Sequence, residues 1–155
     1  MNSSSDHAQI VVNPFLICGG CLFAGLMLQL AIALPFLPLQ SAHILGVIVF
    51  FSGFIFGVPS LIRFRKAKTT LNPHRTTTSF ISGGPFRFSR NPIYVAMILN
   101  YVGLAILFDS LWAIIFLPAV IWLLTLWVII PEEEYLETKF GEEYRKYKAQ
   151  VRRWL

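Results

Sequence analysis

Two short polar stretches carry the side chains that could do chemistry. The first is Arg-Asn-Pro-Ile-Tyr at positions 90–94, and the second is Glu-Glu-Glu at positions 132–134. Pro92 disfavours helical geometry at Asn91, so the Asn91 amide can offer donors and an acceptor where a helix begins. The start of that helix has unpaired N–H groups and partial positive charge, which suit a carboxylate or phosphate. Arg90 adds a fixed cation, and Tyr94 adds a ring and a hydroxyl. These residue types indicate a site for a charged, polar ligand.

The acidic stretch admits several roles. A carboxylate of Glu132 or Glu133 could bind a sugar's hydroxyl pair, face a sulfonium cation or accept a proton. The structural alternative is that acids stabilise the first turn of a helix, while Arg90 and Tyr94 serve as capping and interfacial residues. Residue types alone leave both interpretations open.

The distribution of charge indicates a membrane protein. The 155 residues are 55% hydrophobic, and no Lys, Arg, Asp or Glu lies between Asp6 and Arg63. A second long run, from Asn91 to Ile130, contains one charged residue, Asp109. Such runs suit membrane spans of about 20 residues and lack the charged outer face of a soluble helix. We therefore expect an all-α integral membrane protein with a single domain over residues 1–155.

Four transmembrane helices are expected, at residues 14–34, 44–62, 92–108 and 111–130. A turn through Gln40 to His43 separates the first two, and Asp109-Ser110 turns the third into the fourth, with Ser110 as a cap. A polar loop over 63–91 and a tail over 131–155 complete the chain. The tail predicts an amphipathic helix against the membrane surface or the loop, with Gly141 as a possible bend. Its apolar face is Leu136, Phe140, Tyr144, Tyr147 and Val151.

The basic residues predict the orientation. All 13 Lys and Arg lie between Arg63 and Arg90 or between Lys139 and Arg153. Four spans put both segments on one side, which the positive-inside rule makes cytosolic. We expect cytosolic N- and C-termini, in the cell inner membrane if the chain is prokaryotic. The polar start of the chain lacks the basic region of a secretory signal peptide. No nucleic-acid partner is expected, because topology explains the basic excess.

A Cys-Gly-Gly-Cys sequence at Cys18 and Cys21 could be a redox or metal half-site. Zinc requires about four ligands, and the histidines are scattered. We therefore interpret the cysteines as small buried residues of a membrane helix and expect no metal site.

Two longer motifs resemble those of a known family. They are Gly84-Pro-Phe-Arg-Phe-Ser-Arg-Asn-Pro-Ile-Tyr94 and Glu132-Glu133-x-x-Leu136-x-x-x-Phe140-Gly141-x-Glu143-Tyr144-x-x-Tyr147. Together they resemble the isoprenylcysteine carboxyl methyltransferases and are similar to the membrane phospholipid methyltransferases. The resemblance covers roughly the second half of the chain. It implies an integral-membrane fold that binds S-adenosylmethionine near these motifs on the cytosolic side. The cofactor-binding residues that it implies are Arg90, Pro92, Tyr94, Glu132 and Glu133, and the residue type and position of Asn91 add it to this set.

The chain departs from the prenylcysteine enzymes at Asn91, where they usually have His. Asn-Pro-x-Tyr is closer to the phospholipid methyltransferase pattern, and a His acid or base is not available at this position. Sterol reductases carry a related Arg-His-x-x-Tyr element with a nicotinamide cofactor, which supplies a rival hypothesis. A third hypothesis is a non-enzymatic membrane protein that binds lipid or a partner.

The expected function is therefore methyl transfer from S-adenosylmethionine to a lipophilic acceptor at the cytosolic membrane face. The acceptor could be a prenylcysteine-like carboxylate, a lipid amine or a small thiol. The polar cofactor would enter from the cytosol and the acceptor from the bilayer, and positioning would supply much of the rate. An acceptor that must lose a proton would need a base, and His74 is the one histidine of the loop.

Overall fold

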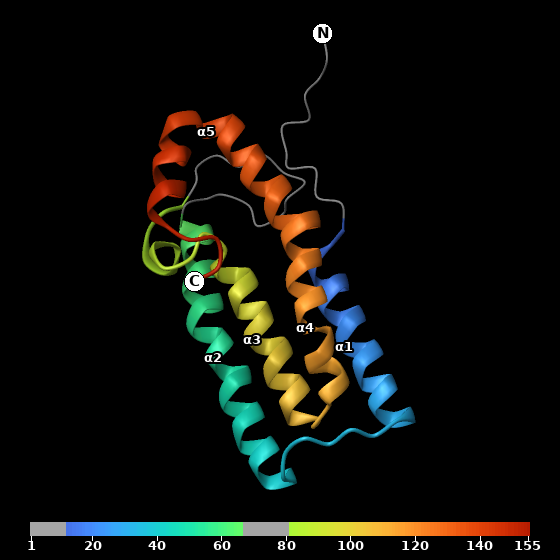
Figure 1. Ribbon diagram of the computed structural model, residues 1–155. Coiled ribbons are helices and arrows are strands. Elements are labelled where there is room, and N and C mark those ends of the chain that lie inside the picture. Colours follow the sequence, from blue (N-terminus) through green and yellow to red (C-terminus); the bar gives the residue numbers. More distant parts are fainter. Residues whose placement is uncertain (1–11, 67–80) are drawn as a thin grey trace.

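The computed structural model describes residues 12–66 and 81–155, and every regular element within these ranges is helical (Figure 1). This confirms the expected all-α class. Element η1 is a 3₁₀ turn and η2 is a π turn. The elements in chain order are α1 (Pro14–Ala31), α2 (Leu39–Lys66), η1 (Gly84–Arg87), α3 (Pro92–Leu107), α4 (Leu111–Leu124), η2 (Thr125–Ile129) and α5 (Ile130–Gln150).

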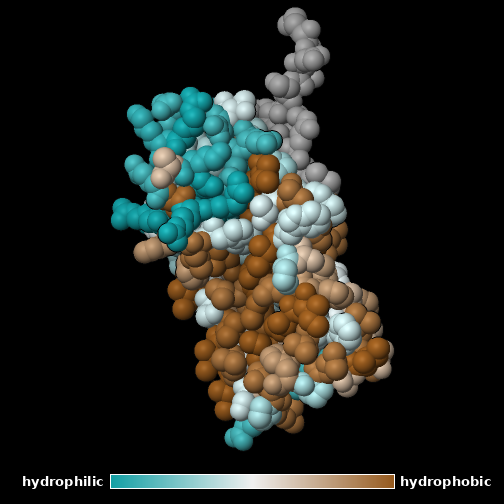
Figure 2. All heavy atoms as spheres, viewed as in Figure 1, coloured by the Kyte–Doolittle hydropathy of each residue, from teal (hydrophilic) through white to brown (hydrophobic). Residues whose placement is uncertain are grey.

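The helices support a multi-pass membrane protein. Within the described residues, α1, α2 and the continuous run Leu111–Gln150 are the 3 helices long and apolar enough to cross a bilayer. The apolar helix α3 is shorter, at 16 residues. A fourth crossing by α3 stays a prediction. Figure 2 shows an apolar body with hydrophilic side chains gathered over the end that carries α5.

Helix α2 is longer at both ends than expected. The predicted turn at Gln40–His43 is wrong, because these residues form the start of α2, where the Ala42 N–H donates to the Pro38 carbonyl across 2.9 Å. A proline just before a helix still offers its carbonyl to the first turn. The predicted loop start at residue 63 is also wrong. The helix continues to Lys66, and its basic last turn suits the negative end of the helix dipole.

The helix that contains the fourth expected span continues past Pro131. Helix α4 passes through the π turn η2 directly into α5, where Pro131 lies in the first turn. Proline lacks an N–H and clashes with the carbonyl four residues earlier, and the wider π turn accommodates both effects. The chain bends at Gly141, whose φ of 55° and ψ of −125° are not helical. The last part of α5 therefore folds back towards η1 (Figure 1).

Small residues allow the helices to pack closely. A Cβ added to Gly46 would lie 2.6 Å from the backbone nitrogen of Leu107, and one on Gly103 would meet the backbone of Phe50. Such approaches are typical of helix pairs in membranes. Helix α1 packs against α4 in the same way, with Gly25 against Ala113. The buried core formed by α1, α3, α4 and η2 comprises Ile17, Tyr101, Ala105, Ala113, Val120, Leu124 and Val128.

The turn between α3 and α4 ties together the end of the bundle opposite α5. Oδ1 of Asp109 accepts hydrogen bonds from the N–H groups of Phe36 and Leu37 at 3.0 and 3.1 Å. Ser110 caps α4, as expected, by accepting from the Ala113 N–H across 3.3 Å. The turn therefore also holds the connection between α1 and α2.

Candidate functional site

The apolar face of α5 positions the site. All five residues that the sequence places on this face pack in one cluster with the 3₁₀ turn, namely Leu136, Phe140, Tyr144, Tyr147 and Val151 with Phe64, Ile81 and Phe86. The Tyr147 hydroxyl donates to the Phe86 carbonyl across 2.7 Å. This contact fixes the segment that leads into α3 against the folded-back part of α5. The five residues therefore contact the segment before α3, while an amphipathic helix against a membrane surface stays a prediction.

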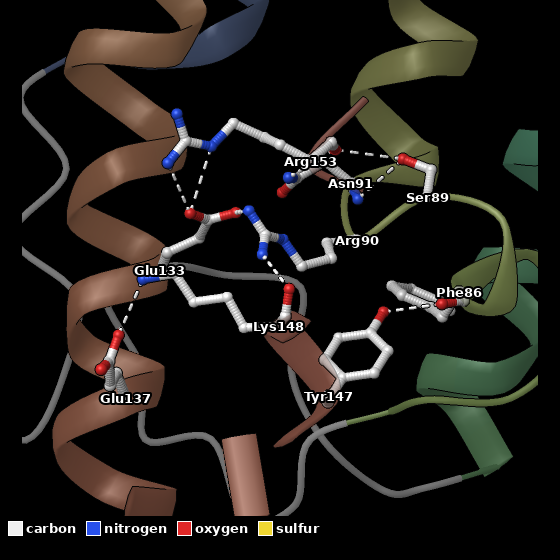
Figure 3. A network of polar contacts seen from close by, with 9 residues as sticks. All are labelled: Phe86, Ser89, Arg90, Asn91, Glu133, Glu137, Tyr147, Lys148 and Arg153. Carbon is white, nitrogen blue, oxygen red and sulfur yellow. Dashed lines mark hydrogen bonds and ion pairs between the residues drawn. The ribbon is translucent and has the colours of Figure 1, made fainter. Parts of the chain in front are cut away.

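The two polar stretches meet at this end of the bundle. Nη2 of Arg90 lies 3.0 Å from Oε1 of Glu133, and the side chains are only 8% and 4% exposed (Figure 3). A buried pair of this kind is stable only when both charges are compensated together. The structure therefore brings Arg90 and Glu133 together, as the sequence predicted.

A second contact joins the same two stretches. The Tyr94 hydroxyl donates to Oε2 of Glu132 across 2.9 Å. Burial and the neighbouring charge of Glu133 raise the pKa of Glu132 above its ordinary value, although the Tyr94 hydrogen bond acts in the opposite direction. Glu132 follows the apolar residues 111–130, so it belongs to the charged end of the run. Within the described residues, no Lys or Arg forms an ion pair with it.

Asn91 and Pro92 lie at the start of α3 as expected, with Pro92 in the first helical turn and both residues buried. The Asn91 side chain does not cap the helix. Its Nδ2 donates instead to the Arg153 carbonyl across 3.0 Å, and its N–H donates to Ser89 Oγ across 3.0 Å. The amide therefore connects the loop to the segment after α5.

That segment, residues 151–155, contributes a cation that sequence reasoning missed. Arg153 donates to Oε2 of Glu133 from Nε at 3.2 Å and from Nη2 at 2.9 Å. Arg90 holds the same region, because its Nη1 donates to the Lys148 carbonyl across 3.0 Å (Figure 3). In the sequence, Arg153 is one of two adjacent arginines after the tail helix. Nothing in the sequence distinguishes it from the other basic residues, which the orientation in the membrane already explains.

Two buried polar atoms of the cluster lack a hydrogen-bond partner among the described residues. These atoms are Arg90 Nε and Glu133 Oε1. Oε1 lies near Arg90 Nη2, so its charge is compensated, but the angles do not form a hydrogen bond. Buried polar atoms are usually satisfied, and orphans indicate strain or an unseen partner. Guanidinium, carboxylate and phenol groups also match a zwitterionic cofactor with hydroxyl groups, so this donor set fits S-adenosylmethionine.

The remaining candidates lie elsewhere. His74 falls outside the described residues. Cys18 and Cys21 are free thiols in α1. No group of three or more His, Cys, Asp or Glu that could hold a metal is found within residues 12–66 and 81–155.

Comparison with known proteins gives one family and one short relative. A family model described as phospholipid methyltransferase matches residues 41–143. A 27-residue segment is 70% identical to a Haemophilus influenzae protein named "Uncharacterized protein", and it covers 17% of this chain and 43% of that relative. No solved structure matches the chain. The family match contains both polar stretches but ends before Arg153.

Proposed function

Because the chain belongs to the phospholipid methyltransferase family, we propose that it is an S-adenosylmethionine-dependent enzyme that methylates a lipophilic acceptor at the cytosolic membrane face. The family is a methyltransferase family, and the helices are those of a multi-pass membrane protein. What we propose beyond this is the identity of the methyl donor, the class of the acceptor and the membrane face at which they meet.

The observation that carries the proposal is the double contact between the two polar stretches. Arg90 meets Glu133 at 3.0 Å and Tyr94 meets Glu132 at 2.9 Å, so α3 and α5 present their polar residues together. Both glutamates belong to the first turn of α5, and hydrophilic side chains gather over the end of the molecule that carries α5, next to the apolar body (Figure 2). A polar cofactor from water and an acceptor from the bilayer would meet at this boundary.

Each residue of the site would have its own role in binding the methyl donor. When bound, S-adenosylmethionine supplies a methyl group activated by a sulfonium centre. Glu132 has no cationic ion-pair partner among the described residues, so its carboxylate would favour the cationic part of the ligand. Arg90 would offer its unpartnered Nε to an anionic part, and Tyr94 would orient Glu132. Asn91 and Pro92 would fix the start of α3, and Glu133 would hold Arg90 in place.

The acceptor side of the proposal rests on the surroundings of the site. Large apolar side chains are exposed along α1 and α2, for example Phe23 at 63% and Ile55 at 70%, which suits lipid contact. A lipid amine, a prenylcysteine-like carboxylate or a small lipophilic thiol would reach the site laterally. An amine or thiol acceptor must lose a proton, and His74 is the histidine of the loop that could accept it, its alternative being a solvated loop residue. Four crossings with cytosolic termini, in the cell inner membrane if the chain is prokaryotic, complete the proposal.

The test uses the full chain purified in detergent. S-Adenosylhomocysteine should bind saturably in a calorimetric titration, while NADPH should not. Methyl-labelled S-adenosylmethionine should then transfer label to the lipid fraction of mixed vesicles. Tight NADPH binding without S-adenosylhomocysteine binding would favour a reductase. A folded protein that binds neither would contradict both enzymatic hypotheses and leave a lipid- or partner-binding protein.

A further inference from the structure

Residues 151–155 follow α5, and Arg153 of this segment lies beside Arg90 and Glu133 (Figure 3). The Arg90 N–H donates to the Arg152 carbonyl across 2.9 Å. The Arg153 carbonyl accepts from Asn91 Nδ2 at 3.0 Å and from Ser89 Oγ at 3.2 Å. These hydrogen bonds attach the main chain of the segment to the loop before α3.

Apolar contacts hold the same segment on both sides of Arg153. Val151 packs with the cluster of Phe86, Tyr144 and Tyr147. Trp154 packs against the core shared by α1, α3 and α4. Two anchors and several backbone hydrogen bonds fix the place of Arg153, so little conformational entropy remains to be lost when a ligand meets it.

Two guanidinium groups share one carboxylate in this cluster. Arg90 and Arg153 both contact Glu133, one at each oxygen, so the positive charges outnumber the negative charge that they contact. The Arg153 side chain is 34% exposed, while that of Arg90 is 8% exposed. A guanidinium group that is fixed, partly accessible and in excess favours a carboxylate or phosphate.

We propose that Arg153 is a further ligand-binding residue, whose guanidinium receives the carboxylate of the amino-acid part of the methyl donor. This inference rests on the proposed function. The buried Nε of Arg90, which has no partner among the described residues, offers a second donor for the same carboxylate. Glu132 supplies the opposite charge on the Tyr94 side, so the cluster is polarised in the way that a zwitterion requires. Residues 151–155 then form one wall of the donor site, beyond the residues that the family model matches.

The experiment compares two probes on matched variants of the full chain in detergent. The probes are S-adenosylhomocysteine and its decarboxylated analogue, which differ only in the carboxylate. The test variant is Arg153→Ala. The control is Arg152→Ala, because the Arg152 side chain is exposed and only its backbone carbonyl joins the network. Thermal unfolding midpoints verify that each variant is folded, and Arg153→Lys provides a milder variant that keeps the charge.

Arg153→Ala should weaken S-adenosylhomocysteine binding by about tenfold or more, since charge-assisted hydrogen bonds are lost. The decarboxylated analogue should change by less than about twofold on the same reasoning. Arg153→Lys should give an intermediate loss, and Arg152→Ala none. Equal losses for both probes would overturn the inference and leave Arg153 as a support for Glu133. Unchanged or tighter binding would overturn it too, the latter because Arg153 would be competing with the ligand. If the folded wild-type chain binds neither probe, the proposed function itself fails.

Discussion

The Tyr94 hydroxyl donates a hydrogen bond to Oε2 of Glu132 across 2.9 Å, which links the first turn of α3 to the first turn of α5. The contact joins the two elements that carry the polar stretches, and it orients a carboxylate that has no ion-pair partner among the described residues. Variants at this contact can therefore show whether Tyr94 contributes to ligand binding beyond its contribution to the stability of the fold.

Tyr94→Phe should reduce both the stability of the fold and the affinity for S-adenosylhomocysteine. Removing the hydroxyl leaves the half-buried Glu132 carboxylate without its donor, which costs about 1–3 kcal/mol of stability for an acceptor that carries charge. S-Adenosylhomocysteine affinity should fall as well, because Glu132 loses its orientation. Thermal unfolding and calorimetric titration in the same detergent measure the two effects.

Tyr101→Phe is the matched control for this change. The buried Tyr101 hydroxyl donates to the Ala113 carbonyl across 2.8 Å, within the core rather than at the site. This variant should lose a similar amount of stability and keep wild-type affinity. Equal affinity losses in the two variants would show that Tyr94 acts only through the fold.

Glu132→Gln should change the pH dependence of stability. The folded-state pKa of Glu132 is raised above the ordinary 4.5, chiefly by burial. Below that ordinary value the carboxyl is protonated in both states and has no effect. As the pH rises through the window up to the raised pKa, the unfolded chain releases its proton first, so the wild type loses stability. Glu132→Gln should therefore become more stable relative to wild type as the pH rises, and the difference should level off above the folded-state pKa.

Unfolding midpoints over a pH series test this sign. Glu134→Gln supplies the baseline, because Glu134 is exposed and adjacent in sequence. A Glu132→Gln difference that is constant with pH would show that Glu132 is not held in a desolvated environment.

Gly103→Ala should disrupt the packing of α3 on α2. The added Cβ would meet the backbone of Phe50, which cannot move aside as a flexible side chain can. Overpacking of this kind costs about 1–3 kcal/mol. The matched control is Gly19→Ala, since a Cβ on Gly19 has no atom within 4 Å. Helix propensity should make that control neutral or slightly stabilising. Similar midpoints for the two variants would contradict the close approach of α2 and α3.

The meeting of Arg90 with Glu133 could be predicted because it depends on topology. Apolar runs of membrane-spanning length alternate direction, so the basic loop and the acidic stretch must return to the same end. That Leu136, Phe140, Tyr144, Tyr147 and Val151 pack in one cluster could also be predicted, because residues at helical spacing share one side. That these residues bind a cofactor stays a prediction.

Other features depended on local geometry that the sequence does not display. The fourth apolar run was expected to end at residue 130, but the helix continues through the π turn at Thr125–Ile129, which accommodates Pro131, into α5. Gly141 indicated a bend without giving its direction. Because the direction of the bend at Gly141 brings Arg153 to Glu133, this contact could not be predicted from two adjacent arginines in the sequence. The hydrogen bonds from Phe36 and Leu37 to Asp109 could not be predicted either, because they join two turns that are far apart in the sequence.

The most direct test of the central claim compares S-adenosylhomocysteine binding to Glu133→Gln and Glu134→Gln. Both changes remove one negative charge at neighbouring positions, but Glu133 is buried between two guanidinium groups while Glu134 is exposed. Glu133→Gln should weaken binding by about tenfold or more, because Arg90 and Arg153 lose the charge that positions them. Glu134→Gln should bind as the wild type does. Equal affinities for the two folded variants would contradict the assignment of this cluster as the cofactor site.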